Sequence, residues 1–256
     1  PGALEKLVAA AECFDADFAK ANFDLYWSKP EERRERMELF KAKDCRKPVH
    51  PSDTVDAFSL KPSIWSAVYR RDFLNRNAIR FLPTPGAAFQ DASFTFKVFA
   101  LADTAVYLHD SVLSYRQDNE GSSVNSPNKV HCVNDEYAEI HRWIVEDFAE
   151  SHSSQDVAKL LRFANIIKYD SYMWSYIRLN PKFYAEFLDR MAHEFELTDL
   201  KPWKRANLMA IVDDPQKWLA ESSDFANAGA MGRAKHYARV GGPGVVAAFV
   251  LDVIKK

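Results

Sequence analysis

The sequence contains few of the features that mark cofactor, metal or disulfide proteins. The motifs G-x-G-x-x-G, H-E-x-x-H and C-x-x-C and the P-loop are all missing, which removes several nucleotide, zinc and redox classes. The seven histidines are scattered, and none forms a ligand-like pair. The three cysteines, Cys13, Cys45 and Cys132, lie far apart. An odd number of separated cysteines in a chain of 256 residues predicts a reducing compartment without a disulfide framework, so we expect a cytoplasmic protein.

A strong charge of one sign and long apolar runs are also missing. The formal net charge is -2, so the chain has no basic surface that would indicate a nucleic-acid partner. No run of about 18 apolar residues occurs, which predicts no membrane-spanning helix, although association with the inner face of a membrane stays open. The first residues carry no signal-peptide pattern. The chain starts without Met inside a helical pattern, which we interpret as an internal cut or a processed start.

The pattern of apolar residues is mixed before residue 130 and almost entirely helical from there to about residue 221. In the first part it predicts helices at 3–13 and 91–101, a turn and short helix at 62–77, and strands at 17–27, 79–81, 105–108 and 112–116. The charged segment 31–47 is expected to be a solvated helix or excursion. In the second part, Asn180-Pro181 breaks the helices, and Gly241 to Gly244 form a hinge before a short apolar helix. We therefore predict two domains, 1–129 and 130–256.

Four short segments between residues 62 and 126 carry the most specific pattern. They are Ile64 to Leu74 (IWSAVYRRDFL), Ile79 to Phe81 (IRF), Gln90 to Phe94 (QDASF) and Tyr115 to Ser123 (YRQDNEGSS). In content and order they resemble the W-x-x-x-Y-R-R-x-F-L helix, the I/L-R-F strand, the E-D-x-x-F motif and the Y-R-x-H-x-x-S segment of bacterial family 2 glycosyltransferases. The resemblance implies an α/β fold of the GT-A type (nucleotide-diphospho-sugar transferase-like), present only as its C-terminal part, followed by a mainly α-helical C-terminal region.

The resemblance also implies an activity and a catalytic base. Inverting glycosyl transfer needs a carboxylate that takes the proton of the acceptor hydroxyl, opposite the leaving diphosphate. In the family the Asp of E-D has this role, which falls here on Asp91. An Asp at this position is also a routine cap for the helix that follows, so the alternative is that Asp91 has only a structural role. Gln90 stands where the family has Glu, and this removes one negative charge beside Asp91.

Further residues are expected to bind the donor or a metal ion. By the resemblance, Arg116 lies near the diphosphate and Asp118 occupies a position where relatives often carry His, so Asp118 is a candidate ligand for a divalent cation, Mg²⁺ or Mn²⁺. Ser122 and Ser123 could donate hydrogen bonds to the donor. The structural alternative for Arg116 is an exposed arginine at the end of a strand. The alternative for Ser122 and Ser123 is a polar turn. Asp15-Ala16-Asp17 has the letters of the family's metal-binding motif, but it follows the first helix, so we interpret it as a helix-to-strand turn.

Trp65, Tyr69 and Gln90 are the candidate acceptor-binding residues. Trp65 and Tyr69 are four residues apart, which would place them on one helix face as a floor for a sugar. The alternative is that both are core residues.

The predicted function is transfer of a sugar from a nucleoside-diphosphate sugar to a glycan or lipid-linked glycan in cell-surface polysaccharide synthesis. In relatives the missing N-terminal half holds the nucleotide and the metal ligands. The alternative is therefore a non-catalytic binding or interaction module that lacks the nucleotide-binding half.

Overall fold

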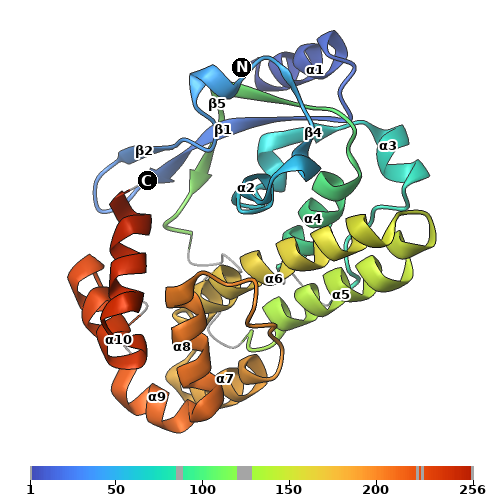
Figure 1. Cartoon of the computed structure of the whole chain (residues 1–256). Helices are drawn as coiled ribbons and strands as arrows, with labels where there is room; N and C mark the ends of the chain where they lie inside the picture. The colour runs from blue at the N-terminus through green and yellow to red at the C-terminus, as the bar shows by residue number, and fades with distance from the viewer. Residues whose placement is uncertain (1, 85–88, 120–128, 223–224, 226–227, 255–256) are drawn as a thin grey trace. The chain divides into compact units, whose positions relative to one another are not determined.

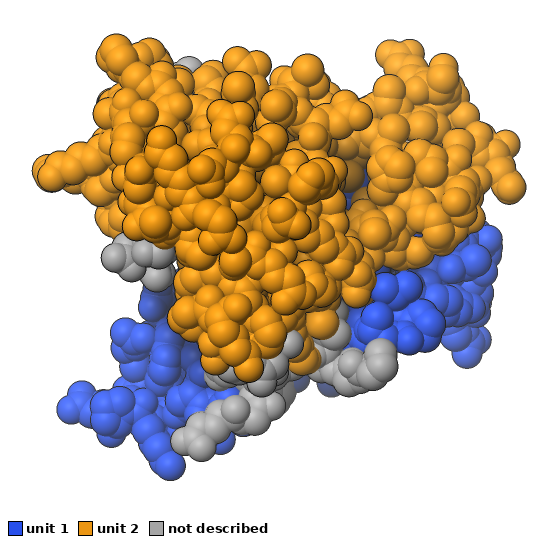
Figure 2. Space-filling view, turned by 90° about the horizontal axis from the view of Figure 1, so that it is seen from below, with its two compact units in different colours: residues 1–123 blue, residues 124–256 orange. Residues whose placement is uncertain are grey.

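The computed structural model describes residues 2–84, 89–119, 129–222, 225 and 228–254 (Figure 1). The chain divides into two compact units, residues 1–123 and residues 124–256, which Figure 2 shows in different colours.

Unit 1 is built around a mixed sheet. Its strands are β1 (Phe18–Trp27), β2 (Arg33–Met37), β3 (Pro48–Val49), β4 (Ala67–Tyr69) and β5 (Ala105–Arg116). The order is β2-β1-β5-β3, and β4 pairs with the first residues of β1. β1 and β5 run parallel, whereas the other pairs are antiparallel. The C-terminal ends of β1 and β5 therefore meet at the same edge of the sheet, the usual place for a ligand site in an α/β fold.

Helices cover both faces of this sheet (Figure 1). They are α1 (Ala3–Cys13), α2 (Val55–Phe58), α3 (Arg71–Arg76) and α4 (Asp91–Leu101), with 3-10 turns η1 (Ala42–Asp44), η2 (Pro51–Asp53) and η3 (Ile64–Ser66). On one face, Leu7 of α1 packs against a core that includes Ala19 and Val106. On the other face, Phe99 of α4 stacks on Phe18 with ring centroids 5.4 Å apart. Since neighbouring strand residues point to opposite faces, Phe18 and Ala19 bury both sides of β1.

Asn22 holds an irregularity in the middle of β1. The register between β1 and β5 shifts on both sides of this residue. Its side chain is fully buried and makes four hydrogen bonds. The amide donates to the carbonyls of Phe40 and His109 (2.9 and 3.0 Å) and accepts from the backbone of Leu39 and Phe40 (2.7 and 2.8 Å). These bonds satisfy the polar groups of a buried amide, so the bulge is stably built into the sheet.

All regular secondary structure in the described residues of unit 2 is helical. Its helices are α5 (Cys132–Glu146), α6 (Ser154–Tyr176), α7 (Tyr184–Ala192), α8 (Pro202–Asp213), α9 (Pro215–Ser222) and α10 (Ala230–Ile254), with 3-10 turns η5 (Phe148–Glu150) and η6 (Pro181–Phe183). Helix α6 begins where Ser153 accepts a hydrogen bond from the amide of Asp156 at 3.2 Å. The predicted break at Asn180-Pro181 is confirmed, because η6 separates α6 from α7.

Several local expectations are confirmed and several are wrong. The helices 3–13 and 91–101 have the predicted bounds, and the predicted strand 17–27 begins at Phe18. Residues 64–74 are a 3-10 turn, a strand and a helix, so Trp65 lies in η3 and Tyr69 in β4, not on one helix face. Residues 79–81 form no strand, and 105–116 form one strand where two were expected. Of the two alternatives for 31–47, a solvated helix or an excursion, the helix is wrong, because residues 33–37 form the mostly exposed strand β2.

Helix α10 corrects a further expectation. It is long and apolar enough to cross a membrane by length and composition, with a mean hydropathy of 1.4 and 11% of that stretch buried. The backbone breaks at Gly242 (φ 73°, ψ −172°), directly before Pro243, which confirms the predicted hinge. Phe249 beyond the hinge is buried against Trp203 and Tyr237. Length and composition alone do not separate a membrane span from a helix of a folded unit.

Candidate functional site

Asp91 is the first residue of α4. Its carboxylate accepts hydrogen bonds from its own backbone amide and from that of Ala92. The preceding Gln90 donates its side-chain amide to the carbonyl and hydroxyl of Thr84 (3.1 and 2.7 Å), and Phe89 has a positive φ of 62°. Gln90 is therefore anchored to Thr84, and the helix dipole favours a negative charge at Asp91.

Two lysines from other parts of unit 1 act on the charge of Asp91. They are Lys61 before η3, with the larger effect, and Lys20 of β1. The charge of Asp91 in turn acts on Tyr69 of β4. Burial raises the pKa of the Asp91 carboxyl to about 6, against the opposing effect of its hydrogen bonds and of the two lysines. Burial, with a smaller contribution from the charge of Asp91, raises the pKa of Tyr69 above its ordinary value. A carboxylate that titrates near neutral pH in a protected position has the properties of a general base.

Lys20 is a charged side chain within the core, with 1% of its surface exposed. Its ammonium donates to the carbonyl of Ser63 (2.5 Å), to the hydroxyl of Ser63 (2.9 Å) and to the hydroxyl of Ser66 (3.2 Å). Burial lowers the pKa of Lys20 to about 7, and the charge of Asp91 opposes this shift. These contacts connect β1 to η3.

An aromatic patch, defined here as Phe23, Trp65 and Tyr115, lies beside these charges. Trp65 stacks on Tyr115 with ring centroids 4.6 Å apart and meets the ring of Phe23 edge-on at 4.5 Å. The ammonium of Lys61 lies 5.6 Å from the ring centroid of Phe23 and 5.2 Å from that of Tyr115. Trp65 is therefore part of a packed cluster, and its half-buried ring is also available to a ligand.

Arg116 and Asp118 stand at the shared end of β1 and β5. One oxygen of Asp118 accepts from the backbone amide and the hydroxyl of Ser28 (2.8 and 2.7 Å) and from the amide of Lys29 (2.9 Å). The other oxygen pairs with Arg116 at 2.9 Å, and Arg116 also donates to the Ser28 hydroxyl at 3.0 Å. These bonds, with those from Ser28 foremost, hold the pKa of Asp118 well below its usual range. We call Ser28, Lys29, Arg116 and Asp118 the strand-end clamp.

The strand-end clamp does not fit the predicted role of Asp118 in holding a divalent cation. Both carboxylate oxygens are engaged by protein donors. In the part of the chain that the structure describes, no group of three or more His, Cys, Asp or Glu side chains could hold a metal ion. A hard cation is normally bound by several oxygen ligands, so the described residues do not form the site that the resemblance implies.

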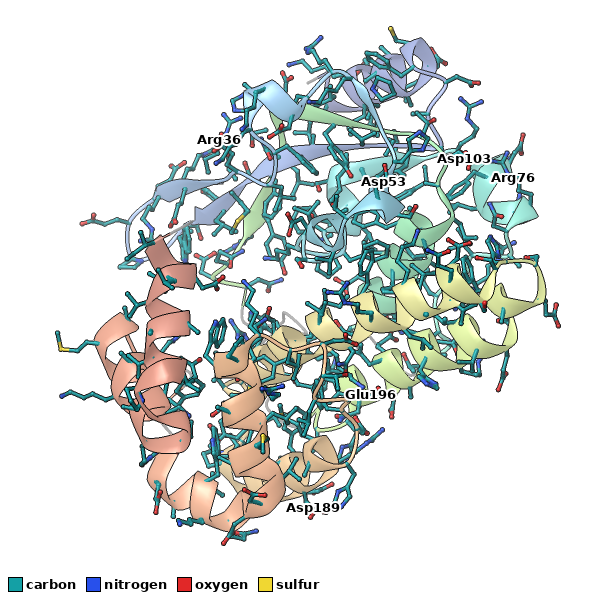
Figure 3. All side chains as sticks on the ribbon, viewed as in Figure 1. Arg36, Asp53, Arg76, Asp103, Asp189 and Glu196 are labelled. Atoms are coloured by element: carbon teal, nitrogen blue, oxygen red, sulfur yellow. The ribbon has the colours of Figure 1, made fainter. Side chains whose placement is uncertain are left out.

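The remaining predicted residues fall into two groups. Ser122 and Ser123 lie outside the described residues. Asp15-Ala16-Asp17 is a helix-to-strand turn, as expected. Asp15 pairs with Arg70 at 2.7 Å, and Asp17 pairs with Arg76 at 2.9 Å while accepting from the amide of Asp103 at 3.0 Å. Arg76 and Asp103 lie at the same end of the sheet in Figure 3.

The charge of Asp91 is coupled to Tyr69 and to two residues that the sequence analysis missed, Lys20 and Lys61. Lys20 lies between apolar residues at the buried start of the strand, and this is a signal, because a buried charge needs a specific reason. Lys61 gave no such signal, since it precedes a proline in an exposed turn.

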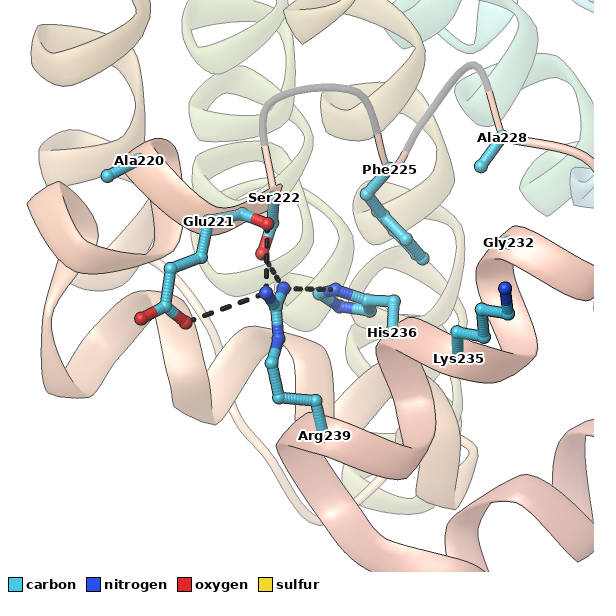
Figure 4. Close-up of a pocket in the computed structure, with 9 residues that line it drawn as sticks. All are labelled: Ala220, Glu221, Ser222, Phe225, Ala228, Gly232, Lys235, His236 and Arg239. Carbon is cyan, nitrogen blue, oxygen red and sulfur yellow. Dashed lines mark hydrogen bonds and ion pairs between the residues drawn. The ribbon is translucent and has the colours of Figure 1, made fainter.

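Unit 2 has an open pocket of about 510 Å³ that contains none of the predicted residues (Figure 4). On one side Arg239 donates to the Ser222 hydroxyl and the Glu221 carbonyl, and it lies 3.1 Å from Nδ1 of His236. Nε2 of His236 lies 2.5 Å from Oδ1 of the Asn207 side chain, which can only accept. His236 therefore carries its proton on Nε2 and accepts from Arg239 on Nδ1, and these polar groups are already paired with one another.

Comparison with solved structures identifies the fold. No family model matches the chain, and no curated protein matches it. S. aureus TarS 1–349 in complex with UDP-GlcNAc aligns at 16% identity and a TM-score of 0.55, covering 87% of this chain and 63% of that one. TarS 1–349 in a second structure aligns at 16% identity and a TM-score of 0.52, covering 87% and 62%. The chain thus spans less than two thirds of TarS 1–349. It has the glycosyltransferase-like α/β fold of TarS, followed by a helical C-terminal region.

Proposed function

We propose that this chain is an inverting glycosyltransferase of the family 2 type, or part of one, and that Asp91 is its catalytic base. The donor would be a nucleoside-diphosphate sugar, and the acceptor a glycan or lipid-linked glycan in cell-surface polysaccharide synthesis. The TarS structure with UDP-GlcNAc supports the donor class. The single observation that carries the proposal is the position of Asp91, protected at a helix start with a pKa of about 6, within a glycosyltransferase-like fold.

The proposed reaction is one displacement at the anomeric carbon. The acceptor oxygen forms a bond to this carbon while the bond to the diphosphate oxygen breaks, and the diphosphate leaves with the electron pair. Asp91 takes the proton of the acceptor hydroxyl as the new bond forms. A base with a pKa near 6 is ionised at neutral pH and is still basic enough to accept that proton.

The aromatic patch supports a role in acceptor binding. A flat indole ring backed by Tyr115 gives the apolar face of a sugar a surface to lie on, and Lys61 adds a cation beside it. Arg116 of the strand-end clamp has an exposed side chain and is our candidate for the departing diphosphate. Dependence on Mg²⁺ or Mn²⁺ stays a prediction, and no step of the mechanism above requires the metal.

The proposal is tested by calorimetric titration of the chain with UDP, GDP and CMP, each with and without Mn²⁺. Binding of one nucleotide identifies the donor class, and transfer of the labelled sugar from the matching donor to lipid-linked acceptors then tests the activity. If no nucleotide binds and no sugar is transferred, the chain as it stands is not a transferase. That result favours the non-catalytic binding module.

A further inference from the structure

The part of α10 that follows the break at Gly242 carries an apolar face that is exposed. Ala247, Val250, Leu251 and Ile254 recur at i, i+3, i+4 and i+7, so they form one line along the helix, which we call the apolar stripe. Val250, Leu251 and Ile254 have 41%, 58% and 74% of their surface exposed. A helix on a folded unit normally turns its polar side to water, so the stripe reverses the usual pattern.

The opposite face of the same segment is fixed to unit 2. Phe249 is buried, and its ring centroid lies 5.7 Å from that of Trp203 and 4.8 Å from that of Tyr237. Asp252 forms an ion pair with Lys201, the residue before α8. With 3.6 residues per turn, Phe249 and Asp252 lie on the side away from the apolar stripe. The segment therefore cannot bury the stripe by turning about its axis without losing both contacts.

This segment is too short to cross a membrane as a helix. The twelve residues from Pro243 to Ile254 span about 18 Å at 1.5 Å per residue, whereas the hydrocarbon core of a bilayer is about 30 Å thick. The part of α10 before the break places His236 and Tyr237 in the core of unit 2. The stripe fits a helix that lies along the surface of a bilayer, with its apolar side chains at the boundary between headgroups and acyl chains.

The charges of this part of the chain are mostly positive. From Ala230 to Lys256 the sequence has one acidic residue, Asp252, and five basic residues, which are Arg233, Lys235, Arg239, Lys255 and Lys256. The first three of these are exposed, and the last two follow the stripe directly in the sequence but lie outside the described residues. The whole chain has a net charge of -2, so the excess is local. An apolar stripe accompanied by basic residues is typical of a helix that binds anionic lipids.

We propose that the apolar stripe of α10 docks unit 2 onto a membrane surface that contains anionic lipids. Val250, Leu251 and Ile254 enter the boundary below the headgroups, while the lysines and arginines of residues 230–256 attract the negative headgroups. The inference is independent of the proposed function, because it rests on α10 and not on Asp91.

The experiment is flotation of the full chain with vesicles of phosphatidylcholine, alone or mixed with phosphatidylglycerol. The wild type is compared with Leu251→Gln/Ile254→Gln, a double change of exposed side chains that leaves the core intact. Leu4→Gln/Val8→Gln is the matched control, because these residues of α1 are also exposed (68% and 43%) and four residues apart on one helix. Circular dichroism verifies that both double variants keep the helix content of the wild type.

Binding of the wild type should require both parts of the surface. The fraction bound to vesicles with phosphatidylglycerol should fall about tenfold or more in Leu251→Gln/Ile254→Gln and stay within about twofold in the control. Binding of the wild type to phosphatidylcholine alone should be about tenfold weaker, and added salt should weaken its binding to the anionic vesicles. The dependence on lipid and salt is measured on the wild type and needs no variant.

The other outcomes overturn the inference. They are a wild type that binds neither kind of vesicle, equal binding of the wild type and the stripe variant, and equal binding of the wild type to both kinds of vesicle. Sedimentation without vesicles tests a second copy as the occupant: a wild-type dimer that becomes monomeric in the stripe variant, with no vesicle binding, assigns the stripe to contact between copies. Vesicle binding by a chain that transfers no sugar supports the docking and contradicts the proposed function, whereas transfer without vesicle binding does the reverse.

Discussion

Asp118, just after β5, accepts hydrogen bonds from both the backbone amide and the hydroxyl of Ser28, just after β1, at 2.8 and 2.7 Å. This contact joins the ends of the two parallel strands at the edge where an α/β fold usually binds its ligand. The resemblance implied that Asp118 binds a metal ion, but its hydrogen bonds indicate that it holds the ends of β1 and β5 together.

Replacement of Asp118 by Ala should therefore lower the thermal stability of unit 1. The change leaves two backbone amides and Arg116 without their acceptor. The pKa of Asp118 is lowered in the folded state, so its contribution should be present above the unfolded pKa of about 4 and should be lost as the pH falls below it. Thermal unfolding at pH 7 and pH 3 measures both effects.

The control for this prediction is Asp53→Ala. Asp53, labelled in Figure 3, is an exposed acid in η2 and should contribute little to stability. Equal stability of Asp118→Ala and Asp53→Ala at pH 7 would contradict the structural role of Asp118. Loss of Mn²⁺ binding in Asp118→Ala without loss of stability would restore the metal assignment.

Replacement of Asp91 by Asn should lower turnover by about a hundredfold or more and leave nucleotide binding almost unchanged, because only proton abstraction is removed. Turnover is measured with the donor that the titration identifies. Asp72→Asn is the matched control, since Asp72 also lies in the first turn of a helix, α3, but is exposed. Near-wild-type turnover of Asp91→Asn would exclude Asp91 as the base.

The sequence predicted best those elements that depend on local pattern. Residues 91–101 carry an apolar stripe after a Pro-Gly turn, and α4 has the predicted bounds. The three residues of β4 could not be found this way, because they form a strand only through pairing with β1, where Phe18 faces Tyr69. Trp65 and Tyr69 are four residues apart, and this spacing wrongly predicted that they share one face of a helix.

The strand β5 is a second case in which the local sequence pattern was not enough, because it is longer than predicted. The two strands predicted at 105–108 and 112–116 left out His109 and Asp110, but the strand continues through them. Asp110 pairs with Lys6 at 2.6 Å and His109 with Glu38 at 3.0 Å, so both polar residues are held by distant parts of unit 1.

The candidate site was only partly predictable, also because it depends on residues that are distant in sequence. Asp91 was found through a short motif, whereas the effect of its charge on Lys20 depends on folding of residues 71 positions apart in sequence.

Replacement of Asn207 by Ala should destabilise unit 2 strongly. Asn207 is fully buried in α8 and bonds to the Tyr169 hydroxyl (2.8 Å), the Trp218 ring nitrogen (2.9 Å) and His236. Its loss leaves three buried polar groups without this partner, and we expect about 2–4 kcal/mol less free energy of unfolding. Urea unfolding followed by Trp fluorescence measures this, with exposed Gln216→Ala in α9 as the control. A loss below about 1 kcal/mol would mean that the network relaxes without Asn207.

The stability of unit 2 should also depend on the protonation of His236. Burial, with a smaller contribution from Arg239, lowers the pKa of His236 to about 4, whereas in the unfolded chain it is about 6.5. Between these values the unfolded state binds the proton more readily, so stability is fully present above pH 6.5 and is lost as the pH falls toward 4.

Wild type and His236→Gln should therefore differ in the slope of unfolding free energy against pH, not only in its level. The wild type should lose about 2 kcal/mol more than the variant between pH 7 and pH 4.5, because other acids titrate equally in both chains. The groups that face His236 are Arg239 of its own helix, Asn207 of α8, and the rings of Trp218 and Phe225. None of them gains a charge in this pH range, so parallel slopes would show that His236 takes up its proton in the folded state and that its environment does not resist the charge.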